Sequence, residues 1–268
     1  MTFTVVPSLS VFRAAVRSQG RIIGALMIRE ALGRFGHQNL GFFWIIAEPL
    51  VLTIGVMLMF YATGRMHGRE VGVIPFVLSA YSLLTLWRHQ CSGSVHVLRK
   101  NAGLLFHRNI RLLDIMIARM VLDSLGGLSA FSIAYGMLTL FELMDDLDDP
   151  LLVAGAWFFM SWFSLGFGLV LAGVTELVES AEHFVAPTLY LVLPFTGAFV
   201  MVVWLPDYIQ RAFLFSPLVN IFEMFRCGLF GSQVPTYWSV TYIGCWCFFL
   251  TAIGLPLIHE AQKRVTVE

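Results

Sequence analysis

The sequence LLVAGAWFFMSWFSLGFGLVLAGV, which occupies residues 151–174, decides the fold class because it contains no Asp, Glu, Lys or Arg. A helix needs about 20 apolar residues to cross the hydrocarbon core of a bilayer. The rest of the chain has the same character, since 58% of its 268 residues are hydrophobic and 13% are charged, and its mean hydropathy is +0.79. Soluble domains are usually about 45–50% apolar. The sequence therefore predicts an all-α integral membrane protein.

Five further apolar stretches approach the length of a crossing, and polar turns separate them. Pro187 and Pro194 interrupt one of these stretches. The six predicted transmembrane helices are residues 41–62, 71–87, 112–140, 151–174, 184–204 and 239–258. Because an even number of crossings returns the chain to its starting side, both termini are predicted to lie on one face of the membrane. We interpret residues 1–268 as a single transmembrane domain.

Two other segments are predicted to be helical without crossing the membrane. Residues 8–19 combine apolar side chains with Arg13 and Arg17, which is typical of an amphipathic helix that lies in the membrane interface. Residues 205–231 divide at Ser216 and Pro217 into two apolar pieces, each shorter than a crossing. Such pieces favour a pair of re-entrant helices that dip into the membrane from the outer face and return to it.

The Lys and Arg residues give this arrangement an orientation. Of the 17 in the chain, twelve lie on the side of the termini and four on the opposite side, with Arg119 inside a predicted crossing. Loops rich in these residues stay in the cytoplasm, so both termini are predicted to be cytoplasmic. The most basic stretch, residues 88–111, has five cations and no acidic residue. It is either a loop that sets topology or a short amphipathic helix that docks a cytoplasmic partner.

Motifs for nucleotide, metal or hydrolytic chemistry are absent from the sequence. It lacks the GxxxxGK[ST] phosphate loop, HExxH, the GxSxG elbow and an EF-hand loop. The four cysteines have no zinc-binding spacing and are interpreted as unpaired packing residues. His89 and His96 could share a helix face, but no third ligand accompanies them. We therefore predict that this chain binds no cofactor, metal or nucleic acid.

Ionisable residues inside predicted crossings are candidates for function because charge is costly in hydrocarbon. Glu48, in the first crossing, is interpreted either as a pathway residue or as a structural carboxylate paired with a neighbouring helix. Arg119 and Asp123 are one turn apart in the third crossing, which favours a structural ion pair. Glu223 and Arg226 are three residues apart in the second re-entrant piece, where the same pairing is predicted. There a functional role is favoured, since irregular backbone at membrane depth usually lines a cavity.

Two stretches of the chain carry a family resemblance. IREALGRFGHQNLGFFWIIAEPLVLTIGVMLMF, residues 28–60, resembles the opening of the membrane subunits of polysaccharide-export ABC transporters, with the RE, RFG, LG, W and EPL elements in the family's order. SPLVNIFEMFRCGLFG, residues 216–231, resembles the family's segment before its last crossing. The resemblance covers essentially the whole chain and is greatest to the capsular-polysaccharide permeases of the KpsM type.

The resemblance implies a dimer of this subunit joined to two copies of a separate ATPase, which binds ATP and Mg. Such an assembly exports a lipid-linked, often acidic polysaccharide across the Gram-negative inner membrane. Its other partners would be membrane lipids and a periplasmic or outer-membrane export protein. In this family a short cytoplasmic helix between the second and third crossings couples to the ATPase. That helix corresponds here to residues 99–111.

The resemblance also implies three groups of site residues. Cationic side chains in the first group suit acidic sugars and lipid phosphate. The cytoplasmic gate, where the substrate enters, would comprise Arg29, Glu30, Arg34, Trp44, Glu48, Arg88, Arg99 and Lys100. The ATPase-coupling residues would be Leu104, Leu105, Phe106, Arg108 and Arg111, and the periplasmic gate would be held by Glu223 and Arg226.

Other functions remain compatible with the sequence. An O-antigen or teichoic-acid permease would share the same features, and so would a drug exporter. An ion-coupled secondary transporter could use Glu48, Asp114 and Asp123 as coupling groups. A membrane glycosyl- or acyltransferase with scattered site residues would escape the motif search. The basic stretch at residues 88–111 disfavours the ion-coupled carrier, in which it has no evident role.

Overall fold

The computed structural model describes residues 9–35, 47–48, 50–51, 53–59, 71–105 and 110–265, and within these ranges the regular structure is helical with no strand. The long helices are α1 (Leu9–Phe35), α3 (Val73–Ser94), α5 (Leu112–Leu140), α6 (Pro150–Leu177) and α10 (Val240–Val265). The shorter ones are α4 (Val97–Leu105), α7 (Glu182–Val192), α8 (Asp207–Leu214) and α9 (Pro217–Phe230). Residues 47–48, 50–51 and 53–59 are also helical.

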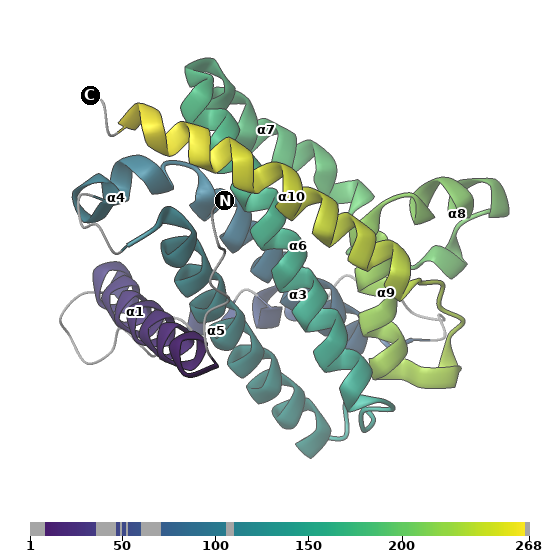
Figure 1. Ribbon diagram of the computed structural model, residues 1–268. Helices are drawn as coiled ribbons and strands as arrows, with labels where there is room; N and C mark the ends of the chain where they lie inside the picture. Colours follow the sequence, from purple (N-terminus) through teal and green to yellow (C-terminus); the bar gives the residue numbers. More distant parts are fainter. Residues whose placement is uncertain are drawn as a thin grey trace.

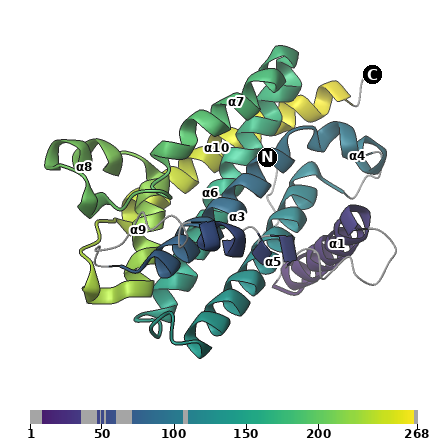
Figure 2. The same cartoon turned by 180° about the vertical axis from the view of Figure 1, so that it is seen from behind.

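Helix α6 occupies the centre of the bundle. It packs against α10, α3, α9 and α5, while α1 packs along α5 at one edge (Figure 1). The opposite view shows α3 alongside α6 and α5, with α8 projecting from the far end (Figure 2). Asp149 starts α6 by accepting hydrogen bonds from the backbone N–H groups of Leu151 and Leu152, and Pro150 occupies the first turn, where its missing N–H costs nothing.

Small residues allow α6 and α10 to approach closely. A Cβ atom added at Gly173 would lie 2.7 Å from Cβ of Leu257, and one added at Gly254 would lie 2.6 Å from Cβ of Leu169. Helices in lipid commonly associate through such residues, since the hydrophobic effect provides little attraction there. The close approach of α6 and α10 therefore depends on glycines facing the neighbouring helix.

Two helices of the structure, α6 and α10, are long and apolar enough to cross a membrane, or three crossings result if α8 and α9 form one broken span. The described residues therefore do not test the expectation of six crossings, which stays a prediction. Helices α3 and α5 have 22 and 29 residues, but Gln90, Arg119 and Asp123 lower their hydropathy. Gln90 and Asp123 are buried, and all three side chains line a small space between the helices.

Several predicted helix boundaries differ from the structure. The interfacial helix expected at residues 8–19 is instead the start of α1, which continues to Phe35 because Gly20 alone does not end a helix. The second predicted crossing extends past residue 87 to Ser94, so Arg88 and His89 are helical rather than in a loop. The predicted coupling helix corresponds to α4, which begins at Val97. Arg111 is the N-cap of α5 and not part of α4.

The fifth predicted crossing, residues 184–204, is not one helix. Helix α7 passes through Pro187 and ends at Val192, and two short 3₁₀ turns, Leu193–Phe195 and Val202–Trp204, flank a bend at Gly197, whose φ is +85°. Eleven residues of α-helix span only about 16 Å, roughly half of a hydrocarbon core. The predicted division at Ser216 and Pro217 is confirmed, because α8 and α9 meet there at an angle of 104°.

The buried apolar residues form two clusters separated by a polar layer. The larger cluster includes Phe76, Trp87, Met160 and Phe225, and the smaller one includes Leu98 and neighbours from α5, α6 and α10. On α5 and α6 the two clusters occupy different stretches of each helix, whereas α3 contributes to the larger cluster. The polar side chains between these stretches belong to Gln90, Ser94, Arg119, Asp123, Ser161 and Ser164.

Candidate functional site

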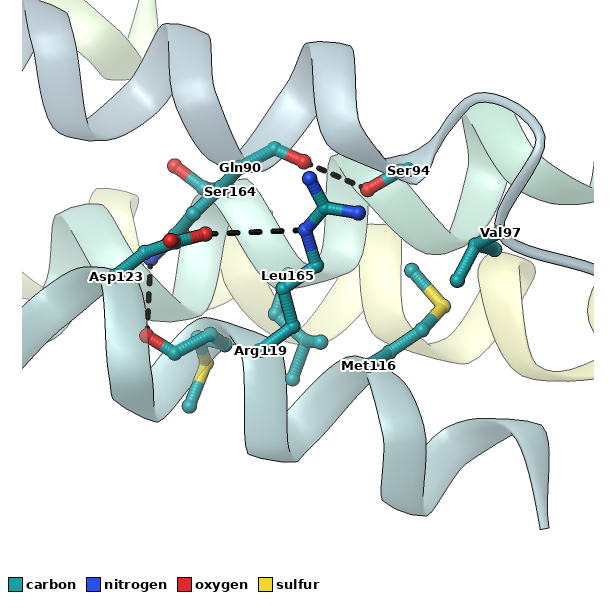
Figure 3. Close-up of a pocket in the computed structure, with 9 residues that line it drawn as sticks. Gln90, Ser94, Val97, Met116, Arg119, Asp123, Ser164 and Leu165 are labelled. Carbon is teal, nitrogen blue, oxygen red and sulfur yellow. Dashed lines mark hydrogen bonds and ion pairs between the residues drawn. The ribbon is translucent and has the colours of Figure 1, made fainter. Parts of the chain in front are cut away.

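The polar layer is organised around an ion pair between Arg119 and Asp123 on α5. Their closest atoms, Nε and Oδ2, are 3.9 Å apart, and the Arg119 guanidinium also donates a hydrogen bond to the carbonyl of Gly93 on α3. The predicted pairing of Arg119 and Asp123 is therefore confirmed. Its i, i+4 spacing places both groups on the face of α5 that meets α3 (Figure 3).

Further hydrogen bonds connect this layer to α6. Gln90 donates to the carbonyl of Met120 at 3.3 Å and to Oγ of Ser124 at 3.2 Å, and Ser124 is 2.5 Å from Oγ of Ser161. A cavity of about 10 Å³ lies beside Gln90, Arg119 and Asp123, and its volume is close to the minimum for one water molecule. Gln90 Oε1 is buried there and has no hydrogen-bond partner among the described protein atoms. The layer thus has an acceptor and a space suited to one water.

A larger polar cleft of about 620 Å³ opens beside the ion pair. Five elements contribute to it: α1, the helical residues near position 48, α3, α4 and α5. Its lining residues are Arg29, Glu30, Gly33, Glu48, His89, Ser92, Lys100, Asn101 and Arg119. Arg119 lines both this cleft and the small cavity, so the cleft is joined directly to the polar layer.

Specific contacts hold the cleft's side chains in place. Arg29 donates a hydrogen bond to the Asn101 side chain, which joins α1 to α4. Glu30 lies 4.0 Å from Arg119, and Nε2 of His89 lies 3.5 Å from Oε1 of Glu48. These contacts leave the Lys100 side chain, which is on the exposed face of α4, as a cation at the cleft wall. Three permanent cations and two carboxylates line the cleft, and Arg119 is in addition paired with Asp123 of the polar layer, so Arg29 and Lys100 are the cations suited to meet an anionic group.

The packing of Arg119 on Gly93 gives a testable consequence. A Cβ added at Gly93 would overlap the guanidinium group, so Gly93→Ala is expected to displace it from the Gly93 carbonyl. A hydrogen bond to a charged group contributes about 1.5–3 kcal/mol. We expect the free energy of unfolding to fall by about that amount, which thermal unfolding of the purified protein would measure. Gly103→Ala on α4, where nothing lies within 4 Å, is the control. Both variants gain the helix propensity of Ala, so equal stabilities would contradict the proposed role of Gly93.

Of the six predicted cytoplasmic-gate residues whose side chains the structure describes, four lie in the cleft. Arg29, Glu30, Glu48 and Lys100 line it together. Asn101, Ser92 and His89 line it as well, although the sequence singled out only His89 among these, and for a different role. The sequence offers one signal for two of them. His89 and Ser92 are three residues apart on α3, so they could share a face of that helix once the helix was known.

Two of the predicted gate residues face another part of the protein. The Arg88 guanidinium lies 5.6 Å from the ring centre of Tyr190 on α7. Arg99 pairs with Glu176 and Glu182 at 3.6 Å each, while His96 lies 3.3 Å from Glu182. Successive helical residues point in directions about 100° apart, which separates Arg88 from His89 and Arg99 from Lys100. These contacts fasten α4 to the acidic turn between α6 and α7.

The remaining predicted residues are only partly covered by the structure. Leu104 is half-buried against the smaller apolar cluster. The side chains of Arg34, Trp44, Leu105, Phe106 and Arg108 lie outside the described residues. The cysteines are unpaired, as predicted. Within the parts of the chain that the structure describes, no group of three or more His, Cys, Asp or Glu side chains could hold a metal ion.

The predicted pair on α9 forms a buried clasp, by which we mean Glu223, Arg226 and the groups that bind them. The side chains of Arg226 and Glu223 are 0% and 1% exposed, and their closest atoms are 3.6 Å apart. Arg226 donates to the carbonyls of Gly197 at 2.9 Å, Ala198 at 2.8 Å and Val200 at 3.2 Å. The predicted ion pair is confirmed, and it is fully enclosed rather than lining an opening.

The clasp connects four segments of the chain. Glu223 accepts hydrogen bonds from the backbone N–H groups of Val202 and Tyr237, both at 3.3 Å. On α3, Oγ of Ser79 lies 3.4 Å from Nε of Arg226, and the Phe76 ring centre lies 4.8 Å from the guanidinium carbon. Carbonyls of the non-helical stretch between the two 3₁₀ turns are thereby satisfied by a charged donor, which explains how this irregular backbone can be buried.

Comparison with known proteins places these features in one family. The model of the ABC-2 type transporter family matches residues 21–230. The capsule polysaccharide export inner-membrane protein CtrC of Neisseria meningitidis serogroup B is 33% identical over 95% of this chain and 96% of its own length. BexB of Haemophilus influenzae, which has the same description, is 31% identical over 95% and 96%.

A more distant relative is the polysialic acid transport protein KpsM of Escherichia coli, 22% identical over 94% of this chain and 98% of its own length. The resemblance seen in the sequence is thus confirmed, with greater similarity to CtrC and BexB than to KpsM. The match spans the helices that form the polar cleft and the clasp. The chain belongs to the ABC-2 type transporter family.

Proposed function

We propose that this chain is the membrane subunit of an ATP-driven exporter that moves capsule polysaccharide across the bacterial inner membrane. The observation that carries the proposal is the polar cleft, where Arg29, Lys100 and Arg119 from three helices surround one space. Relatives 31–33% identical over nearly their whole length are named capsule polysaccharide export inner-membrane proteins. The substrate we assign to the cleft is the anionic, lipid-linked end of the polymer.

The energy source is a separate subunit in this proposal, because the sequence has no phosphate loop. Two copies of the chain would join two ATPase subunits that bind ATP and Mg, with both termini of each copy in the cytoplasm. Helix α4 would serve as the coupling helix. Its ion pairs through Arg99 to Glu176 and Glu182 would pass a movement of α4 directly to the α6–α7 turn.

The opposite face of α4 also supports its role as the coupling helix. Lys100 and Asn101 of α4 line the cleft, and Asn101 holds Arg29 of α1. A displacement of α4 by the ATPase would therefore alter the cleft and the α6–α7 turn together. The clasp at Glu223 and Arg226 would support a periplasmic gate by positioning α9, since both side chains are buried away from any passing polymer. A periplasmic or outer-membrane partner would receive the polymer there.

Ion-coupled transport has less support from the contacts of its candidate carboxylates. Asp114 caps α5 through the backbone N–H of Arg111 and accepts a hydrogen bond from Gln19. Asp123 is 5% exposed beside Arg119. Groups engaged in this way are poorly suited to repeated ion binding and release, so these contacts favour the exporter.

The proposal predicts that Arg29→Gln combined with Lys100→Gln lowers export. Charge-assisted hydrogen bonds contribute about 1.5–3 kcal/mol each, and about 1.4 kcal/mol is tenfold in affinity, so we expect at least a roughly tenfold fall in surface polysaccharide per cell. Co-purification with the ATPase subunit should be unchanged. Surface polysaccharide would be measured with a polymer-specific antibody, and assembly by affinity capture of the membrane subunit.

Arg13→Gln combined with Arg17→Gln is the matched control, because both arginines are on α1 and Arg17 is exposed away from the cleft. Like the test variant, this control removes two positive charges, but it removes both from α1 and outside the cleft. Normal surface polysaccharide on cells carrying Arg29→Gln and Lys100→Gln would contradict the proposal. So would an export defect of equal size in the control.

A further inference from the structure

A second cleft lies between the first turn of α5 and the last turns of α10. Its volume is about 600 Å³, and it shares no lining residue with the polar cleft. The residues that line it are Arg111, Leu113, Leu255, Ile258, His259, Gln262 and Lys263. Among them Arg111 has a predicted role in ATPase coupling, and the proposed function uses none of the other side chains. We refer to this space as the α5–α10 cleft.

The lining of the α5–α10 cleft is divided into an apolar part and a basic part. Leu255, Ile258, His259, Gln262 and Lys263 follow the 3–4 residue spacing of one helical face on α10. Along this face the side chains change from apolar to polar and basic toward the end of the helix. On α5 the basic Arg111 comes first and the apolar Leu113 follows, so both helices have the same polarity gradient from their shared end.

The charge in the α5–α10 cleft is positive. No carboxylate is among its lining residues. Asp114, the nearest acidic residue on α5, is buried and is engaged by Gln19 and by the backbone N–H of Arg111. Glu260 pairs with Lys263 at 3.0 Å, but both side chains are more than half exposed, and such pairs contribute little. With Glu260 counted against Arg111 and Lys263, one positive charge remains in excess at the cleft, which favours an anion.

We propose that the α5–α10 cleft binds an anionic glycerophospholipid of the surrounding leaflet. Its phosphate would lie between Arg111 and Lys263, with His259 and Gln262 as additional hydrogen-bond donors, and an acyl chain would lie along Leu113 and Leu255. Basic pockets where membrane helices end bind phosphate head groups in this way, and the guanidinium fork of arginine fits phosphate oxygens. The adjoining apolar half separates a lipid from a free phosphate ion, which has no apolar part to bury.

The lipid site is tested on the full-length protein, purified in the complex in which it is isolated. Lipid retained by the protein is measured by native mass spectrometry after equilibration with mixed micelles of phosphatidylglycerol and phosphatidylcholine. We expect the unaltered protein to prefer phosphatidylglycerol. In Arg111→Gln combined with Lys263→Gln the preference should fall roughly tenfold to thirtyfold, from about 1 kcal/mol per basic residue near a membrane surface.

Controls separate this site from general charge effects and from small anions. Arg17→Gln combined with Arg21→Gln removes two exposed arginines of α1 and should leave the preference unchanged. His259→Gln combined with Lys263→Gln alters only the exposed face of α10, and a fall in preference there supports the site even if a substitution at the α5 cap impairs folding. Equal retention of both lipids by the unaltered protein would overturn the proposal. Displacement of phosphatidylglycerol by millimolar inorganic phosphate would overturn the assignment to a lipid.

Discussion

Arg226→Met is expected to lower the free energy of unfolding by about 3–5 kcal/mol, as removal of one partner from a buried ion pair usually does. The substitution leaves the Glu223 carboxylate enclosed without its counter-charge. It also removes the donor for the carbonyls of Gly197, Ala198 and Val200. Because buried carbonyls without partners are costly, the bend between α7 and α8 should become unstable together with α9.

The measurement is the thermal unfolding of the purified protein together with its accumulation in the membrane. Arg226→Lys keeps the charge but lacks the guanidinium fork that reaches three carbonyls, so its stability should fall between those of the unaltered protein and Arg226→Met. Arg211→Met on the exposed surface of α8 is the control and should change stability by less than about 0.5 kcal/mol. Stability of Arg226→Met equal to that of Arg211→Met would show that the clasp is not needed for the fold.

Gly254→Leu is expected to separate α10 from α6. A Cβ at this position would lie 2.6 Å from Cβ of Leu169 and 3.2 Å from the backbone nitrogen of Val170, and neither backbone can move without shifting its helix. Overpacking of a well-packed core usually costs about 1–3 kcal/mol and sometimes more. Since α6 is the centre of the bundle, we expect a loss at the upper end of that range and little folded protein at 37 °C.

Gly244→Leu is the matched control because Gly244 is on the same helix and has nothing within 4 Å of an added Cβ. Both substitutions replace glycine with leucine and gain similar helix propensity. Size-exclusion chromatography of detergent extracts would report the amount of folded protein, and thermal unfolding its stability. A loss in Gly244→Leu as large as in Gly254→Leu would mean that leucine on α10 is harmful irrespective of the contact with α6.

The features predicted well from the sequence are those set by local chemistry. Proline cannot donate a backbone hydrogen bond and restricts the residue before it, so the dipeptide Ser216-Pro217 was sufficient to predict the break between α8 and α9. The i, i+4 spacing of Arg119 and Asp123 likewise fixed their proximity. The extension of α1 was missed because the sequence prediction ended the helix at Gln19, before Gly20, whereas residues 20–35 contain no proline and continue the same helix, which packs on α5.

The polar cleft was harder to predict because it depends on contacts between distant segments. Arg29 and Asn101 are 72 residues apart in the chain, and no local sequence pattern around either residue indicates that the two are in contact. Residue type identified Arg29, Arg88, Arg99 and Lys100 as equivalent cations. The difference between them is the direction in which each helix face points, which depends on how α3 and α4 join at His96, a residue with a φ of +63°.

The clasp also determines when this protein can complete its fold during synthesis. Ser79 and Arg226 are 147 residues apart, and chains grow at about 5–20 residues per second. For roughly 7–30 s after Ser79 is made, the part of α3 that receives the guanidinium exists without it. Helices α3, α5 and α6 are therefore all translated before the arginine that fastens the α7–α8 bend. Completion of the outer part of the bundle is consequently a late event in the life of the nascent chain.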